Sequence, residues 1–62
     1  MNNLPHSQSR EYFIMMQVLN RPPIEIAGPY DSASVATYES ASLMSNESDQ
    51  TVRYFVEPRD KS

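Results

Sequence analysis

The fold of this chain is most constrained by residues 12–19 (YFIMMQVL). All of them except Gln17 are large and apolar or aromatic, and the 62-residue sequence contains no other apolar run of this length. The run stops at residues 20–23 (NRPP), and a residue that precedes proline avoids helical backbone dihedrals. A short apolar run that ends this way predicts a strand over residues 11–19, although methionine and leucine would also suit a helix.

Two further strands are indicated by alternation of apolar and polar side chains. Residues 24–27 (IEIA) alternate in this way, and a connection of four residues joins them to the first strand, which predicts an antiparallel hairpin. Residues 50–57 (QTVRYFVE) follow the same pattern and predict a third strand, which Pro58 would end.

One helix is predicted over residues 32–44, between the second and third strands. Gly28 and Pro29 end the second strand, and Asp31 suits the N-cap, where its carboxylate would accept a backbone N–H. Asn46 suits the left-handed position that follows a helix. The stripe that would face the sheet carries mostly small side chains, so the helix can approach closely: Ala33, Ala36, Thr37, Ser40, Leu43 and Met44.

These elements predict an α+β fold of order β-β-α-β. It has a three-stranded antiparallel sheet in the order 2-1-3, with one helix on one face, because the most apolar strand belongs in the middle. Either face of the first strand could meet the helix. Its even-numbered residues are assigned to the core, because they match the apolar side chains of the other two strands: Ile24, Ile26, Val52, Tyr54 and Val56. Residues 1–10 are predicted to form a flexible N-terminal arm, residues 11–58 a single domain and residues 59–62 a charged C-terminal tail.

The second face of the sheet is expected to stay exposed, because one helix covers only one face. It combines aromatic, methionine and arginine side chains, which are enriched at protein interfaces. The predicted partner-binding residues are Phe13, Met15, Gln17, Leu19, Arg53 and Phe55. A secondary contact is assigned to Tyr38 and Glu39 on the outer side of the helix. The edge strands also offer unpaired backbone groups, and a homodimer that stacks two open faces is the simplest assembly.

The composition argues against an enzyme and against cofactor or metal sites. The chain has no cysteine, one histidine and one glycine, which leaves no disulfide, no plausible zinc site and no glycine-rich phosphate loop. The serine-rich segment 31–42 has no histidine beside it to activate a nucleophile. We therefore predict no catalytic residues, no metal and no cofactor.

The remaining pattern predicts a small non-enzymatic protein-binding module that regulates or inhibits a larger protein. The acidic β-β-α-β plan is similar in size and architecture to small phage-encoded inhibitors of host enzymes. This similarity implies a phage or mobile-element origin and a host or cognate enzyme as partner. The alternative is a nucleic-acid-binding module that stacks bases on Phe13 and Phe55, which the net charge of −3 disfavours. No membrane span or signal peptide is expected, so a cytoplasmic location is predicted.

Overall fold

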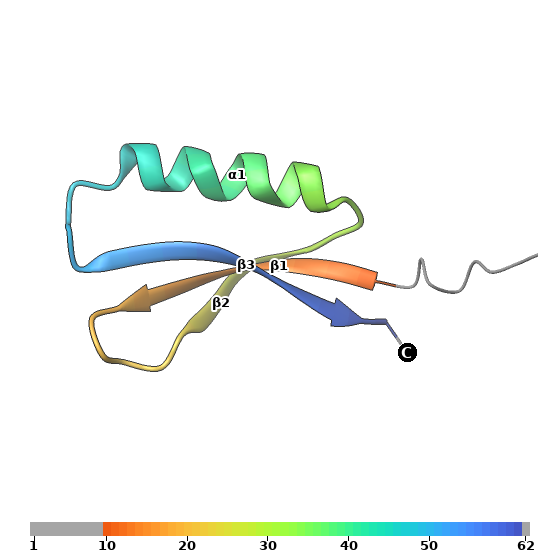
Figure 1. Cartoon of the computed structure of the whole chain (residues 1–62), viewed down its shortest axis with the longest axis horizontal. Coiled ribbons are helices and arrows are strands. Elements are labelled where there is room, and N and C mark those ends of the chain that lie inside the picture. Colours follow the sequence, from red (N-terminus) through yellow and green to blue (C-terminus); the bar gives the residue numbers. More distant parts are fainter. Residues whose placement is uncertain (1–9, 62) are drawn as a thin grey trace, which may run out of the picture.

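The structure is a three-stranded antiparallel sheet with a helix on one face (Figure 1). This computed structural model describes residues 10–61, so residues 1–9 of the predicted arm and Ser62 lie outside the described residues. The elements are β1 (Arg10–Val18), β2 (Ile24–Tyr30), α1 (Ala33–Asn46) and β3 (Val52–Asp60). The sheet order is β2-β1-β3, which confirms the predicted α+β fold with the apolar strand in the middle.

The pairing of β3 with β1 is regular along the whole of both strands, and Val18 lies opposite Val52 at one end. Just beyond that pair, the Leu19 N–H donates to the Thr51 carbonyl oxygen at 2.9 Å. This bond fixes the alternation of the ladder. The odd-numbered residues of β3 turn their backbone N–H and C=O groups toward β1, and the even-numbered residues turn theirs toward the free outer edge.

Pro58 lies inside β3, opposite Tyr12. The prediction that Pro58 ends this strand was therefore wrong. As an even-numbered residue on an edge strand, Pro58 occupies a position where the ladder needs no N–H, so the ring costs no hydrogen bond. The strand continues to Asp60, and two residues of the predicted tail, Arg59 and Asp60, belong to the sheet.

The even-numbered residues of β1 face the helix, as predicted. Tyr54 lies opposite Met16, and its phenol donates to Glu47 Oε1 at 2.6 Å at the end of α1. Because side chains alternate along a strand, Ile14 and Met16 share this face. Ile14 is fully buried at the centre of the sheet. The assignment of Ile24 and Ile26 to the core was wrong, because they are 53% and 41% exposed on the edge strand β2. The core therefore sits between the middle of β1 and the helix.

The helix α1 begins and ends slightly later than predicted. Its N-cap is Ser32, whose Oγ accepts from the Val35 N–H at 3.3 Å, so the assignment of Asp31 as the cap was wrong. Asn46 is the last helical residue, and Glu47 after it is extended, so the predicted left-handed cap at Asn46 is absent. The strand β2 continues to Tyr30, so the chain enters the helix one residue later than predicted.

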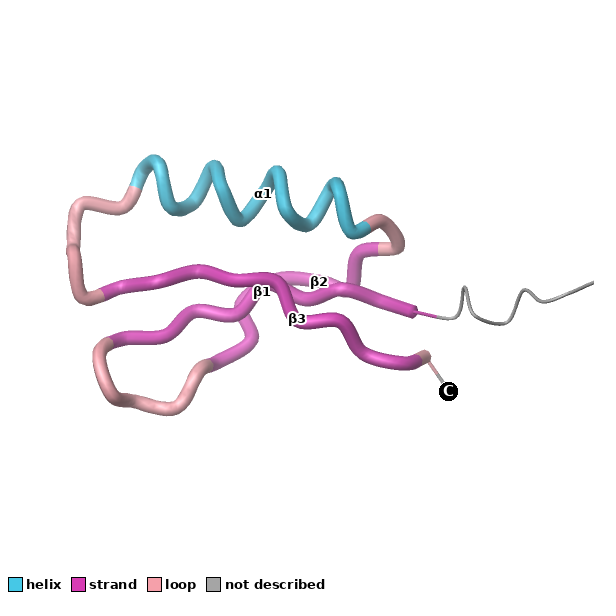
Figure 2. Tube along the Cα trace, in the orientation of Figure 1, coloured by secondary structure: helices cyan, strands magenta, loops and turns pink. Residues whose placement is uncertain are grey.

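Only part of the predicted small-residue stripe on α1 is buried. Ala36 is fully buried and Ser40 is nearly so, with the Ser40 hydroxyl donating to the Thr37 carbonyl at 3.0 Å. Leu43 is half-buried, whereas Ala33 and Met44 are exposed. The small side chains at the contact allow the helix to lie along the sheet (Figure 2). No helix among residues 10–61 has the length and apolar character needed to cross a membrane.

The loop between α1 and β3 is fixed by Asp49. Its Oδ1 accepts from the Thr51 N–H at 2.9 Å and from the Thr51 hydroxyl at 2.7 Å, and these hydrogen bonds hold the pKa of Asp49 below its usual value. The Asp49 carbonyl accepts from the Val52 N–H at 3.1 Å. The turn thus satisfies the first outward-facing N–H of β3 within the chain.

The bond between Tyr54 and Glu47 predicts a loss of stability at alkaline pH. The hydrogen bond to Glu47 raises the pKa of Tyr54 above its usual value, and burial and the carboxylate charge act in the same direction. The stabilisation is complete below the pKa of an unfolded tyrosine, about 10, and is lost as the pH rises through the folded pKa.

Denaturation at about pH 9 and about pH 11 should show this loss of stability in the wild type. Tyr54→Phe should reduce the loss, whereas Tyr38→Phe, on the exposed side of α1, should not. Equal profiles for the two variants would contradict the assignment.

Candidate protein-binding surface

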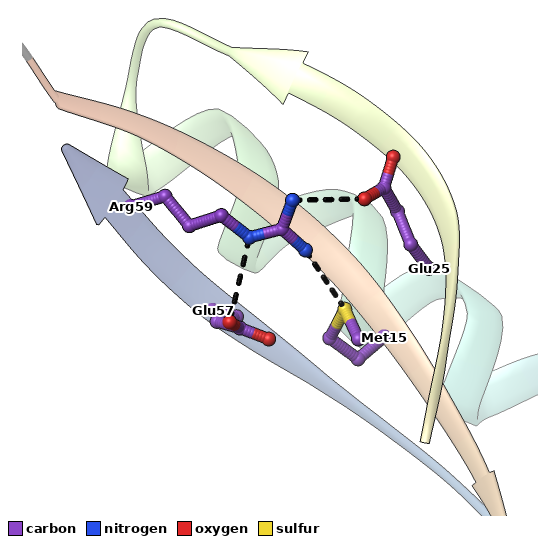
Figure 3. A network of polar contacts seen from close by, with 4 residues as sticks. All are labelled: Met15, Glu25, Glu57 and Arg59. Carbon is purple, nitrogen blue, oxygen red and sulfur yellow. Dashed lines mark hydrogen bonds and ion pairs between the residues drawn. The ribbon is translucent and has the colours of Figure 1, made fainter. Parts of the chain in front are cut away.

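The sheet face opposite α1 is covered at one end by Arg59. Its guanidinium carbon lies 4.0 Å from the centroid of the Phe13 ring. Its Nη1 donates to Glu25 Oε1 at 2.9 Å and its Nη2 lies 3.7 Å from the Met15 sulfur (Figure 3). Its Nε lies 3.4 Å from Glu57 Oε2. One side chain therefore connects all three strands, and we call these five residues the Arg59 clamp.

The expectation that Phe13 and Met15 would be exposed was wrong. Phe13 is 9% exposed and Met15 is 7% exposed, because the Arg59 side chain lies across both. An arginine covers apolar surface with its stem and its flat guanidinium while its charge stays near water. The face of the Phe13 ring is therefore occupied, which removes one of the two aromatic platforms on which the nucleic-acid alternative relied.

The carboxylates around Arg59 stabilise its charged guanidinium. The hydrogen bond with Glu25 raises the pKa of Arg59, with further contributions from the charges of Glu57 and Glu25. Two carboxylates thus share one guanidinium, which has enough N–H donors for both. The two acidic side chains come from opposite edge strands, β2 and β3, and the clamp ties these edges together across β1.

Arg59→Ala is expected to lower the thermal unfolding midpoint by roughly 5 °C, because it uncovers Phe13 and removes the cation–π contact. The unfolding midpoint of Arg59→Lys should fall between those of the wild type and Arg59→Ala. A lysine ammonium keeps the charge, but it lacks the planar fork with which arginine reaches both carboxylates. Melting curves followed by circular dichroism measure the shift. Arg53→Ala is the matched control, because Arg53 is an exposed arginine on the same strand and face. Equal shifts for the two alanine variants would contradict the clamp.

The other end of this sheet face is open to solvent. Phe55 lies opposite Met15 and is 38% exposed, and Arg53 lies opposite Gln17 and is exposed. Gln17 is half-buried, and its side-chain amide donates to the Arg21 carbonyl at 3.1 Å. We call Gln17, Arg53 and Phe55 the Phe55 patch. The structure therefore brings together three of the six residues assigned to partner binding on an accessible surface.

Leu19 lies just beyond the ladder and is 66% exposed. Its backbone φ is +50°, a left-handed conformation that interrupts the alternation of a strand. Leu19 thus belongs to the turn after β1 and is not a regular member of the sheet face. The turn signal in the NRPP sequence was correct, but the change of direction begins one residue earlier than predicted.

The secondary contact assigned to the helix also lies at the surface. Tyr38 and Glu39 are both exposed, and Tyr38 lies on the outer side as predicted. Tyr38 lines a shallow depression together with Ala41, Ser42 and Ser45. These neighbours are small and carry no charge, so the depression offers one aromatic ring and few specific contacts.

Within the described range 10–61, no group of three or more potential metal ligands comes together. Buried side-chain polar atoms in this range all have hydrogen-bond partners. The accessible features are therefore an aromatic and arginine patch, an open strand edge and a shallow depression on the helix. Neither a protein-family model, nor a curated protein, nor a solved structure matches this chain.

Proposed function

We propose that this protein is a small non-enzymatic protein-binding module that regulates or inhibits a larger protein. The observation that carries the proposal is the exposure of Phe55 on an edge strand with Arg53 beside it. Phenylalanine and arginine are both enriched at protein interfaces, and arginine is also enriched among their hot spots. A partner that covers the Phe55 patch gains apolar burial at the ring and hydrogen bonds at the guanidinium.

The free edge of β3 supports the same proposal. The N–H groups of Tyr54 and Val56 point away from β1, one on each side of Phe55 in the sequence. A strand of the partner that is added to this edge gains backbone hydrogen bonds. The Phe55 patch then makes the contact specific for certain side chains of that partner. The Arg59 clamp holds the neighbouring half of the face in place, so little ordering is needed on binding.

The choice of a larger enzyme as partner, and of a phage or mobile element as source, rests on the small acidic β-β-α-β plan. The Phe55 patch adjoins the outer edge of β3, and this arrangement suits a protein that acts by covering a site on another. The acidic balance of the chain favours a partner with a basic surface.

Quantitative affinity capture from cells that carry the gene tests the proposal. Phe55→Asp should remove the captured partner, because it places a charge at the centre of the contact. Val35→Asp is the matched control, since Val35 is an exposed apolar residue in the first turn of α1, where an acidic side chain is favourable. Circular dichroism checks that both variants fold. Retention of every captured protein by Phe55→Asp, or an equal loss with Val35→Asp, would contradict the proposal.

A further inference from the structure

Among the described residues 10–61, no strand pairs with the outer edge of β3, and this edge has a short open segment with defined ends. The Val52 N–H is used by the Asp49 carbonyl at 3.1 Å, and Pro58 has no N–H. Between them, Tyr54 and Val56 direct their N–H groups outward. The edge therefore offers two backbone donors, placed symmetrically around Phe55. Such a segment is the template for one added strand.

The side chains of this segment are complementary to a second copy of themselves. In the sequence VRYFVEP (52–58), Arg53 and Glu57 stand two residues before and two residues after Phe55. When two such strands run antiparallel with Phe55 opposite Phe55, Arg53 of each copy lies opposite Glu57 of the other. Opposite charges at directly facing positions stabilise an antiparallel pair.

We propose that two copies of this protein pair through β3, antiparallel about a two-fold axis at Phe55, to form a continuous six-stranded sheet. In this register Tyr54 of each copy faces Val56 of the other. These are the residues whose backbone groups point outward, so each of their N–H groups meets a carbonyl of the second copy. The two-fold axis stands perpendicular to the sheet and places both helices on the same face.

Two-residue shifts of this register lose both ion pairs. A shift in one direction places Arg53 opposite Arg59 of the second copy, which sets like charges against each other. The opposite shift leaves Glu57 facing Thr51, with no charge to meet it. Shifts by one residue are excluded, because they set outward backbone groups of one strand against inward ones of the other. Charge complementarity thus selects the register centred on Phe55.

The groups that the pairing needs are accessible. Arg53 is exposed and forms no ion pair with any residue in the described range 10–61. Glu57 approaches Arg59 through Oε2, and its Oε1 can accept from Arg53 of the second copy. The two Phe55 rings meet at a pair without direct backbone hydrogen bonds, where side chains approach most closely. A chain of this size also gains stability from a second copy.

The pairing goes beyond the proposed regulatory function and uses the same edge and Phe55 patch, so a partner would bind the monomer in competition with the second copy. A monomeric protein that still loses its captured partner on Phe55→Asp would overturn the pairing and leave the function standing. A dimer that captures no partner would do the reverse.

Sedimentation equilibrium over a range of concentrations tests the pairing in the full chain. The wild type should dimerise reversibly. Arg53→Glu and Glu57→Arg should each raise the dissociation constant by about tenfold or more, because the two-fold axis makes each substitution act at two pairs. The double variant should recover most of the wild-type affinity. A wild type that stays monomeric at millimolar concentration, or a double variant no tighter than Arg53→Glu, would overturn the proposal.

Disulfide cross-linking locates the two-fold axis. The sequence contains no cysteine, so only the introduced residue can form the cross-link. Phe55→Cys should oxidise to a covalent dimer, because facing positions at an antiparallel pair lie within the reach of a disulfide. Leu19→Cys is the control, since Leu19 is more exposed but lies on the turn after the central strand. Faster cross-linking of Leu19→Cys than of Phe55→Cys would overturn the placement of the axis.

Discussion

Gly28→Ala is expected to lower the free energy of unfolding by about 2–4 kcal/mol. Gly28 has a φ of +122°, which an L side chain rarely adopts. A Cβ at this position would lie 2.8 Å from Phe13 Cδ2 and 2.9 Å from the Tyr12 carbonyl oxygen. The Tyr12 oxygen belongs to the backbone of the central strand, so it cannot move aside without disturbing the sheet. The strand β2 therefore needs glycine at this position, where it passes close to Tyr12 and Phe13.

Urea denaturation of Gly28→Ala measures this loss, and Leu19→Gly provides the reciprocal test. Leu19 is the non-glycine residue with positive φ among residues 10–61, and glycine relieves the strain of that conformation. Leu19→Gly is expected to leave the free energy of unfolding unchanged or to raise it by up to about 1 kcal/mol. A Gly28→Ala protein within about 0.5 kcal/mol of the wild type would show that β2 does not pass this close to Phe13.

Ile14→Ala is expected to cost about 2–5 kcal/mol, because Ile14 is fully buried beneath α1 and its removal leaves a cavity. Ile14 lies opposite Val56 on one side and Ala27 on the other, so all three strands contribute to the space around it. A single core in a domain of this size rarely supplies more than about 3–5 kcal/mol. The loss is therefore comparable to the whole stability of the domain, and the variant should be measurably less folded than the wild type at room temperature.

The matched control is Ile26→Ala, which removes the same atoms from a side chain that is 41% exposed. Ile26 is the extra residue of β2 between the positions that face Ile14 and Met15. We expect a loss below about 1 kcal/mol at this position. Circular dichroism and urea denaturation of both variants give the comparison. Equal losses at positions 14 and 26 would contradict the assignment of the core to the helix side of β1.

The strand order could be predicted from the sequence because one run is far more apolar than the rest. A strand that is buried on both sides must be apolar on both faces, and residues 12–19 alone meet that condition. The structure buries Phe13 and Met15 as well as Ile14, so both faces of β1 are indeed used. The assignment of the even face to the helix followed from the same alternation.

The ends of β2 and β3 could not be predicted, because they depend on tertiary hydrogen bonding. Local rules end a strand at glycine or proline, yet β2 continues through Gly28 and Pro29 with two irregularities in its register. Pro58 is tolerated because its missing N–H falls at the free edge. Which residues face the edge is set by the register with β1, and no local pattern encodes that register.

The exposure of the candidate site was only partly predictable for a related reason. Alternation placed Gln17, Arg53 and Phe55 on one face correctly. The cover over Met15 comes from Arg59, which lies 44 residues away in the sequence and looked like part of a charged tail. The available signal was the composition of β2 and β3. Glu25 and Glu57 both contact Arg59 on this face, and two carboxylates on one face favour a cation between them.

Relaxation by a soluble paramagnetic probe tests the division of this sheet face into a half covered by Arg59 and an exposed half. The measurement is made by NMR on the wild type at low concentration, where pairing between copies is negligible. Protons of the Phe55 ring and the Leu19 methyl groups should relax strongly. Those of the Phe13 ring and the Met15 methyl group should be protected beneath Arg59. Relaxation of Phe13 and Met15 as strong as that of Phe55 would show that Arg59 does not cover them.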